Sequence, residues 1–183
     1  MRTFFPVLLL CFSSLLSAQN DDGPRREVGI QIQGINFDGN NSFSALFKKQ
    51  VKPNVWWRYS AASAGLNFFA NQNNNVTIFN IRLAVGRELR LPVGERFTFY
   101  RGPQLSMGFR IVYPDNNDVD WIIRPGIGYV LGFQHEINRF WGINIETTPT
   151  FSAEVANPFQ ENFSLAVAGG FSNTVELGVF RRF

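Results

Sequence analysis

Apolar and polar residues alternate with a period of two along most of this chain. In the segment WGINIETTPTFSAE, which starts at Trp141, the odd-numbered positions are mainly apolar and the even-numbered positions are polar or small. The segment WIIRPGIGYVLGFQHE, which starts at Trp121, repeats this pattern. Because successive side chains of a strand point to opposite faces, the alternation predicts strands whose two faces meet different environments. After the first twenty residues no apolar run is long enough for a helical membrane anchor.

Short turn signals divide the alternating pattern into eight segments. Gly, Pro, Asn and Asp cluster between them, as in LPVGE at 91–95 and PDNND at 114–118. A change of phase in the third segment predicts a β-bulge near Ser63 to Gly65. An even number of strands brings both chain ends to the same side of a closed up-and-down barrel. The predicted strands are about 27–37, 43–51, 55–69, 76–90, 96–113, 119–136, 140–153 and 163–183.

The polar face of these strands is rich in glycine and alanine. Small residues suit the crowded interior of an eight-stranded barrel, whereas glycine on a soluble exterior only weakens a strand. We therefore expect an all-β fold, an eight-stranded antiparallel up-and-down transmembrane β-barrel with a polar lumen filled by side chains. A soluble barrel of the calycin type, with its apolar face inside, is the alternative. The small residues are Gly102, Gly108, Gly126, Gly128, Gly132, Gly142, Ala166, Ala168 and Gly178.

Aromatic residues gather at strand ends. With strands that run up and down in order, one group of rings falls at the end of the barrel that holds the chain termini, and a second group falls at the other end. Belts of aromatic rings at both interfaces are typical of membrane barrels, while a ligand-binding calyx has no reason to sort its rings in this way. The predicted interface girdle at the terminal end consists of Trp56, Trp57, Phe97, Phe99 and Trp141.

The inward-facing positions carry charges of both signs in nearly equal number. In a narrow lumen an isolated buried ion is costly, so these side chains must pair. The sequence predicts a structural salt-bridge network that plugs the barrel. A narrow path for ions or small solutes, lined by the same residues, is the alternative. The predicted network consists of Arg58, Arg82, Arg110, Arg124, Glu88, Glu136, Glu146 and Glu176.

The first residues, MRTFFPVLLLCFSSLLSAQN, have the pattern of a secretory signal peptide: a basic start, an apolar run and a small-residue exit. We expect cleavage after residue 18 or 19, so that 1–18 is the signal, 19–26 a short periplasmic lead-in and 27–183 the barrel. Cys11 is the only cysteine. A lipoprotein signal at this cysteine is the alternative, but the bulky Leu10 argues against it. The mature chain then has no disulfide and no thiolate metal site.

Composition and residue types argue against several functions. The net charge of +3 and the 17% of charged residues do not indicate nucleic-acid binding. His135 is the only histidine, and it falls on the outward parity beside a turn, away from a nucleophile that it could activate. The aspartates of PDNNDVD lack the spacing of a calcium loop. We therefore expect no catalytic residues, no cofactor and no metal site.

The chain ends in NTVELGVFRRF, which resembles the outer-membrane β-signal at Glu176, Gly178 and Phe183, although Arg181 departs from it. With the signal peptide and the eight strands, the mature chain resembles the small outer membrane β-barrel family, the OmpA/OmpX-like porin-family barrels, along nearly its full length. The resemblance implies a multi-pass protein of the Gram-negative cell outer membrane, in contact with the lipid bilayer and outer-leaflet lipid and inserted by the barrel assembly machinery.

From this resemblance we expect a non-enzymatic protein with a structural or surface-interaction role. A small outer membrane channel and a secreted soluble calycin that binds an apolar ligand are the alternative functions. In the expected topology the connections near 37–42, 70–75, 114–118 and 154–162 face the outside.

Overall fold

The computed structural model describes residues 25–33, 42–63, 67–71, 74–114, 120–156, 164–168 and 175–183. The predicted signal peptide lies outside the described residues, as do the Gly65 part of the predicted bulge and most of the predicted outer connections. Within the described ranges, no helix has the length and apolar character needed to cross a membrane. The strands are β1 (Arg26–Gln33), β2 (Ser42–Lys52), β3 (Val55–Ser63), β4 (Asn67–Asn71), β5 (Asn74–Pro92), β6 (Phe97–Pro114), β7 (Asp120–Glu136), β8 (Trp141–Thr147), β9 (Thr150–Ala156), β10 (Ser164–Ala168) and β11 (Val175–Arg182).

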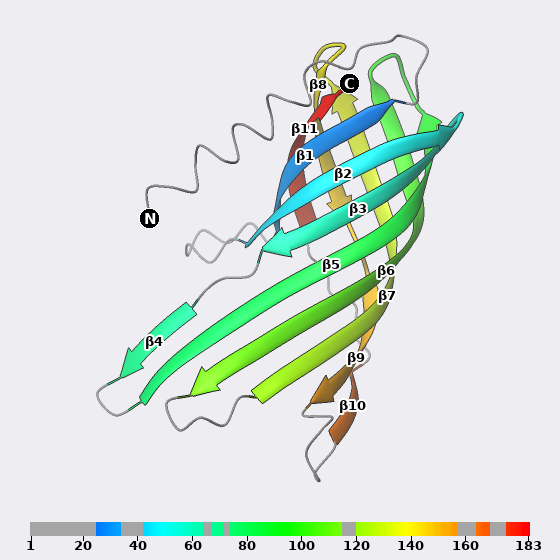
Figure 1. Ribbon diagram of the computed structural model, residues 1–183. Helices are drawn as coiled ribbons and strands as arrows, with labels where there is room; N and C mark the ends of the chain where they lie inside the picture. The colour runs from blue at the N-terminus through cyan, green and yellow to red at the C-terminus, as the bar shows by residue number, and fades with distance from the viewer. Residues whose placement is uncertain are drawn as a thin grey trace.

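Eight of these strands close into one antiparallel barrel. Each strand pairs with the next in the order β1, β2, β3, β5, β6, β7, β8 and β11, and β11 returns to pair with β1. At this seam the backbone N–H of Arg26 donates to the Phe183 carbonyl at 3.1 Å, and the N–H of Phe183 donates to the Arg26 carbonyl at 2.8 Å. The seam holds the start of β1 and the end of β11 side by side (Figure 1). The eight-stranded antiparallel barrel predicted from the alternation is confirmed.

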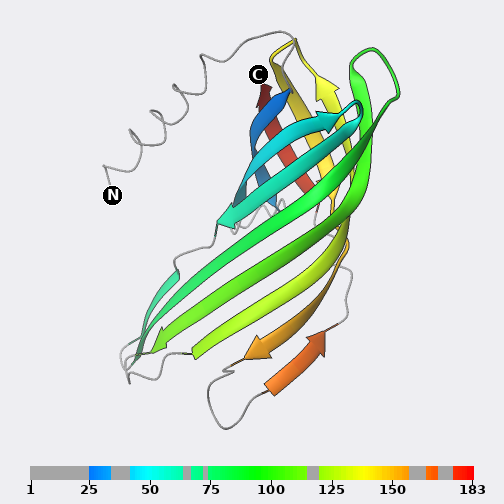
Figure 2. The ribbon, with the colours of Figure 1, turned by 45° about the vertical axis from the view of Figure 1, so that its right-hand side comes forward.

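The barrel is closed around its terminal end and flares at the other end. β5, β6 and β7 are far longer than β1 and β2, and the extra length of β5 and β7 pairs with β4 and β9. β10 adds to the edge of β9. In Figure 2 these segments form a wide sheet that runs on past the closed ring. Among the described residues, the eight strands therefore enclose the polar lumen near the terminal end.

Three predicted strands are divided in the structure. The predicted strand 163–183 contains β10, which pairs with β9, and β11, which pairs with β1 and β8. The predicted strand 140–153 separates into β8 and β9 at Thr148 and Pro149, and proline has no N–H to give to the ladder. The predicted strand 55–69 separates into β3 and β4. Ser63 pairs with Ile81, while Asn67 pairs with Ile78, so the registers of β3 and β4 on β5 differ by one residue. The interruptions after Ser63 and Thr147 come directly at the ends of two strands of the closed ring, β3 and β8.

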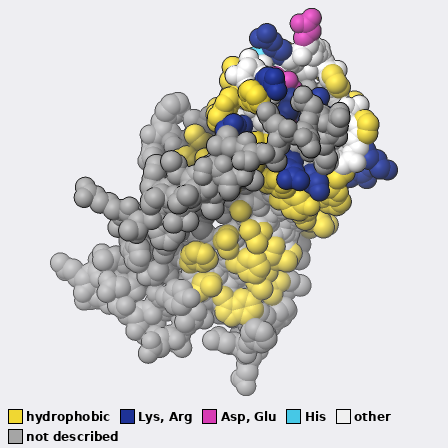
Figure 3. Space-filling model, turned by 45° about the horizontal axis from the view of Figure 1, so that its top comes forward, with side chains coloured by type: hydrophobic (Ala, Val, Ile, Leu, Met, Phe, Trp, Pro, Cys, Tyr) yellow, Lys and Arg dark blue, Asp and Glu magenta, His cyan; other side chains and the backbone are white. Residues whose placement is uncertain are grey.

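Exposure alternates along the strands in the sense expected of a membrane barrel. Leu131, Ile143 and Leu177 point outward and are 37%, 45% and 41% exposed, whereas Glu146 points inward and is 2% exposed. Burial alternates strictly along β8 and along most of β11. Figure 3 shows hydrophobic side chains over the visible wall below the closed end. The apolar face is the outer surface, and the polar face fills the interior.

Inward glycines make room for the large inward side chains. A Cβ atom at Gly132 would overlap the Tyr100 ring, and a Cβ atom at Gly142 would overlap the Phe180 ring. Gly86 faces Arg58 in the same way, since a Cβ there would lie 3.0 Å from the Arg58 Cγ. The glycines of the polar face thus provide the space that an eight-stranded interior otherwise lacks.

Candidate functional site: a charge network in the lumen

Glu88 on β5 is the centre of a buried charge network. Its Oε1 lies 2.6 Å from the Lys48 ammonium of β2 and 3.4 Å from the Arg58 guanidinium of β3. Its Oε2 accepts from Arg90 of the same strand at 3.2 and 3.3 Å. Glu88 is fully buried, and its three partners are at most 5% exposed. The single Glu88 carboxylate thus partly neutralises the charges of three cations, which come from three strands.

Arg58 extends the network toward β6 and β8. Its Nη2 lies 2.5 Å from Oε1 of Glu146, and its Nη1 lies 3.3 Å from Oε2 of the same carboxylate. The Tyr100 hydroxyl donates to Glu146 Oε2 at 2.7 Å and accepts from the Asn144 amide at 3.1 Å. The Lys48 ammonium lies 4.2 Å from the centre of the Tyr100 ring. Glu146 thus accepts hydrogen bonds from Arg58 on β3, from Tyr100 on β6 and from Asn144 on its own strand.

Arg90 extends the network in the other direction, to the seam between β1 and β11. Its guanidinium donates to both oxygens of Glu27 at 2.9 and 2.7 Å, the two-pronged geometry that makes arginine–carboxylate pairs strong. Glu27 also accepts from Arg182 at 2.9 and 3.0 Å and from Gln134 at 3.2 Å. Arg182 then reaches Glu136 at 2.8 Å. The chain of contacts runs across the whole cross-section of the barrel.

Each strand of the closed ring contributes a side chain to this lumen network, so the network ties the eight strands together. In the described residues it joins four cations to four carboxylates, and two amides and one phenol complete the contacts. Because most of these side chains are buried and paired with one another, the arrangement holds the wall in register and fills the lumen. The members are Glu27, Lys48, Arg58, Glu88, Arg90, Tyr100, Gln134, Glu136, Asn144, Glu146 and Arg182.

The structure brings together only part of the predicted network. Arg58, Glu88, Glu136 and Glu146 belong to it, and Glu176 is buried on β11 in register with Glu146. The remaining three predicted members, Arg82, Arg110 and Arg124, lie elsewhere.

Arg82, Arg110 and Arg124 do not reach the lumen network, and the prediction that they belong to it is wrong. Arg124 pairs with Glu154 at 2.7 Å at an exposed position. Arg82 is exposed, and Arg110 is half-buried. All three have the inward parity. Arg110 and Arg124 lie on the parts of β6 and β7 that extend past β3 and β8, and Arg82 pairs with Ala62 near the far end of β3. Parity therefore placed them on the inward face of their strands, but further from the chain ends than the lumen network.

Several members of the lumen network were absent from the predicted set. Lys48, Arg90, Arg182 and Glu27 are among the inward-facing charges that the parity of the sequence gives, although they are not in the predicted set. Tyr100 was harder to predict as a member, because aromatic residues at nearby positions of the same strand, such as Phe97 and Phe99, face outward. Its signal in the sequence was its even position between Thr98 and Gly102.

The predicted interface girdle is divided by the structure. Trp57, Phe97 and Trp141 are exposed on the outer wall, and Phe99 packs on Phe133 with 5.1 Å between ring centres. Trp56 is 4% exposed and faces inward, so its assignment to the girdle is wrong. Adjacent strand residues point to opposite faces, and only one of the two tryptophans can point outward.

Trp56 closes one side of the lumen network instead. The Arg90 guanidinium lies over its ring at 3.7 Å, a distance at which a cation is attracted to the ring face. His135 lies on the outer wall, where it stacks on Phe97 at 4.4 Å.

The residues of the predicted assembly signal occupy three different environments. Glu176 is buried, and Gly178 lies against the side chains of Asn144 and Gln31, where a Cβ atom would not fit. Phe183 is half-buried at the rim, with the Arg181 guanidinium 5.2 Å from its ring centre. The same guanidinium lies 5.7 Å from the Trp141 ring. Arg181 thus lies among interface rings rather than at mid-wall.

Comparison with known proteins identifies the fold. No protein-family model matches the sequence, and no curated protein matches it. Among solved structures, Ail, the attachment invasion locus protein of Yersinia pestis, in complex with the heparin analogue sucrose octasulfate, aligns over 87% of this chain and 99% of its own, with 12% identity and a TM-score of 0.52.

Two further solved structures align over most of the chain. The N-terminal β-barrel domain of Pseudomonas aeruginosa OprF matches 88% of this chain and all of its own, with 11% identity and a TM-score of 0.44. Neisserial surface protein A matches 87% of this chain and 94% of its own, with 10% identity and a TM-score of 0.42. At 12% identity the likeness to Ail concerns the fold alone, an eight-stranded antiparallel β-barrel.

Proposed function

We propose that this protein is an integral outer membrane β-barrel protein, non-enzymatic, with a structural or surface-interaction role and a lumen closed by its charge network. The supporting observation is the reversed polarity of the barrel. Outward residues such as Ile127 are apolar and up to 64% exposed, while Arg58 and Glu88 are buried inside. Contact between such an apolar outer surface and lipid acyl chains is favourable, whereas its contact with water is unfavourable.

The proposed location follows from the wall together with the chain start. In this proposal the signal peptide directs export and is cleaved, residues 19–26 form a periplasmic lead-in, and the barrel inserts in the outer membrane with its wall against the lipid bilayer and outer-leaflet lipid. The barrel assembly machinery is the partner during insertion, through Glu176, Gly178 and Phe183 on or beside the last strand. The position of Phe183 at the seam between the first and last strands of the ring supports this role.

The proposed closed lumen rests on the density of the lumen network. Its central side chains, Glu88, Arg58 and Tyr100, are at most 2% exposed, and they contact one another directly or through Glu146. An ion that crossed this section would have to displace paired charges, and breaking such pairs in a buried site is costly. This argues for a plug rather than for the alternative of a solute channel.

Cell fractionation tests the proposed location. We expect the mature chain in the outer membrane fraction, extracted only by detergent, with faster gel migration before boiling than after it. Release of the chain with the soluble periplasmic proteins, without detergent, would contradict the proposal. That result would favour the soluble calycin alternative in spite of the polarity of the wall.

A further inference from the structure

The outward face of the barrel carries a row of cations near its terminal end. Lys49 on β2 is in register with Trp57 on β3, and Trp57 is in register with Arg87 on β5. Arg101 on β6 pairs with Leu89, two residues along β5 from Arg87. Directly paired side chains lie about 5 Å apart, and diagonal ones remain within reach of long side chains. Lys49, Trp57, Arg87 and Arg101, all exposed, thus form one continuous patch, the basic row.

The cations of the basic row are not neutralised by the protein. Within the described part of the chain, Lys49, Arg87 and Arg101 have no carboxylate partner. Glu27, Glu88, Glu136 and Glu146 on the closed ring pair with Lys48, Arg58, Arg90 and Arg182, and Glu176 is buried on the inward face. Figure 3 shows the basic side chains gathered toward the closed end of the molecule. An anion that neutralises the basic row must therefore come from outside the described barrel.

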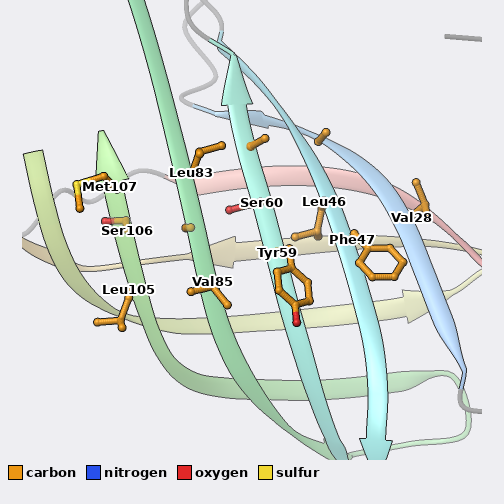
Figure 4. Close-up of a pocket in the computed structure, with 13 residues that line it drawn as sticks. Val28, Leu46, Phe47, Tyr59, Ser60, Leu83, Val85, Leu105, Ser106 and Met107 are labelled. Atoms are coloured by element: carbon orange, nitrogen blue, oxygen red, sulfur yellow. The ribbon is translucent and has the colours of Figure 1, made fainter. Parts of the chain in front are cut away.

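An apolar groove begins one step below the basic row on the same four strands. Phe47, Tyr59, Val85 and Leu105 lie in register across β2, β3, β5 and β6, two residues further from the chain ends. The next step holds Ala45, Ala61, Leu83 and Met107, and the two alanines leave the wall hollow. These residues line a cavity of about 630 Å³ (Figure 4).

The junction between the row and the groove has mixed character. In Figure 4 the Tyr59 hydroxyl points toward the start of β3, the side on which Trp57 and the basic row lie. The Tyr59 and Phe47 rings lie 6.0 Å apart and form a wall beside the cavity. From the basic row to the groove, the exposed groups are therefore first cations, then the Tyr59 hydroxyl, and then apolar side chains. That order matches a molecule with a phosphate at one end and a hydrocarbon chain at the other.

We propose that the basic row and the groove together bind one anionic phospholipid, with its phosphate against Lys49 and Arg87 and an acyl chain along the groove. This inference rests on the proposed membrane location. An ammonium and a guanidinium match a phosphodiester in charge and hydrogen bonding. A free inorganic phosphate has no apolar part that could fill the groove, and a neutral hydrocarbon has no negative charge that could neutralise the cations.

Native mass spectrometry of the full barrel in a zwitterionic detergent tests the proposal. The barrel is titrated with phosphatidylglycerol or with phosphatidylcholine, and bound lipids are counted. We expect one phosphatidylglycerol to bind in preference to phosphatidylcholine. The double substitution Lys49→Gln and Arg87→Gln is expected to weaken phosphatidylglycerol binding roughly 25-fold, about fivefold for each cation, and to leave phosphatidylcholine binding unchanged.

The double substitution Arg96→Gln and Arg139→Gln is the matched control. Both residues are exposed in turns, the change in net charge is the same, and neither residue borders the groove, so binding is expected to stay at the wild-type level. Ala61→Phe fills the groove and leaves the cations in place, and it is expected to weaken phosphatidylglycerol binding at least fivefold. Equal effects of the two double substitutions, or wild-type binding by Ala61→Phe, would overturn the proposal.

Failure of this inference can be distinguished from failure of the proposed function. Heat-modifiable gel migration reports whether each variant still forms the closed barrel. Fractionation of the wild-type chain reports its location separately. A folded barrel in the outer membrane that shows no preference for phosphatidylglycerol refutes the lipid site alone.

Discussion

At the scale of single residues, the cost of a buried charge is set by its partners. Glu88 contacts Lys48, Arg58 and Arg90, and all four side chains are buried. Removal of one partner from such a group leaves the others uncompensated in a medium of low dielectric constant, which typically costs about 3–5 kcal/mol. Glu154 forms a pair of the same chemistry with Arg124, but both members are partly exposed, and such pairs contribute about 0–1 kcal/mol.

Glu88→Gln is therefore expected to lower the free energy of unfolding by about 3 kcal/mol or more. Glu154→Gln, the control, is expected to change it by less than about 1 kcal/mol. Urea titration of each variant in lipid vesicles, followed by tryptophan fluorescence and by heat-modifiable migration, measures both. Losses of equal size would mean that the lumen network does not stabilise the barrel.

At the scale of elements, two backbones approach closely where β5 meets β6. The register continues from Gly86–Gln104 to Leu89–Arg101, with no paired positions between them. A Cβ atom at Gly102 would lie 2.9 Å from the Arg87 carbonyl carbon and closer still to its oxygen. At Gly108, further along β6, a Cβ atom would lie 3.4 Å from the Arg124 Cβ, an ordinary contact. Only the first glycine is required by the pairing of the two strands.

Gly102→Ala is expected to destabilise the barrel by about 1–3 kcal/mol, because the backbone of β5 must move to admit the methyl group. Gly108→Ala is expected to be neutral, or to stabilise by up to about 1 kcal/mol, because alanine loses less conformational entropy in a strand. The same urea titration compares the two variants. A harmless Gly102→Ala would show that the strands can separate there without cost.

The last strand combines a structural role with the proposed assembly role. Phe183 makes its two seam hydrogen bonds through its backbone, so loss of its ring, which lies near the Arg181 guanidinium, leaves those bonds in place. Phe183→Ala is expected to lower the amount of heat-modifiable barrel in the outer membrane severalfold in cells. Phe97→Ala removes another rim ring, from a strand that carries no assembly signal, and is expected to have little effect. Equal losses in immunoblots of outer membrane fractions would contradict the assembly role.

At the scale of the whole molecule, the lumen is closed at one end and wide at the other. The closed ring holds the lumen network, while Arg82, Arg110 and Arg124 lie further from the chain ends on β5, β6 and β7. In the proposed closed lumen, a solute that crossed the barrel would have to pass the paired side chains of this network.

The wild-type protein is expected to show no steady single-channel conductance in planar bilayers. Tyr100→Ala removes a fully buried ring from the network and is expected to produce intermittent conductance. Tyr129→Ala, on the outer wall at 43% exposure, is the control and is expected to remain silent. A steady conductance of the wild-type barrel, in preparations whose folding is confirmed by gel migration, would refute the closed lumen.

The sequence by itself determined the strand-forming segments, the closure of eight strands and the face of each strand that points outward. These properties are local or additive. Alternation depends on residues two apart, and turns depend on a few adjacent residues. Trp56 shows that position along a strand is a weaker guide than parity. Its place near a strand end suggested a ring at the membrane interface, while its parity required a side chain that points inward.

Only the tertiary structure decided which inward charges meet. Arg58 and Glu146 are 88 residues apart, and their contact depends on the stagger of every strand between them around the ring. Arg124 has the same parity as the members of the lumen network, yet it lies where the shorter β1 and β2 no longer close the wall. Parity fixes the direction of a side chain, but its height along the barrel axis follows from registers accumulated over the whole sheet. The position along the barrel axis therefore decides whether an inward charge forms a buried ion pair or an exposed one.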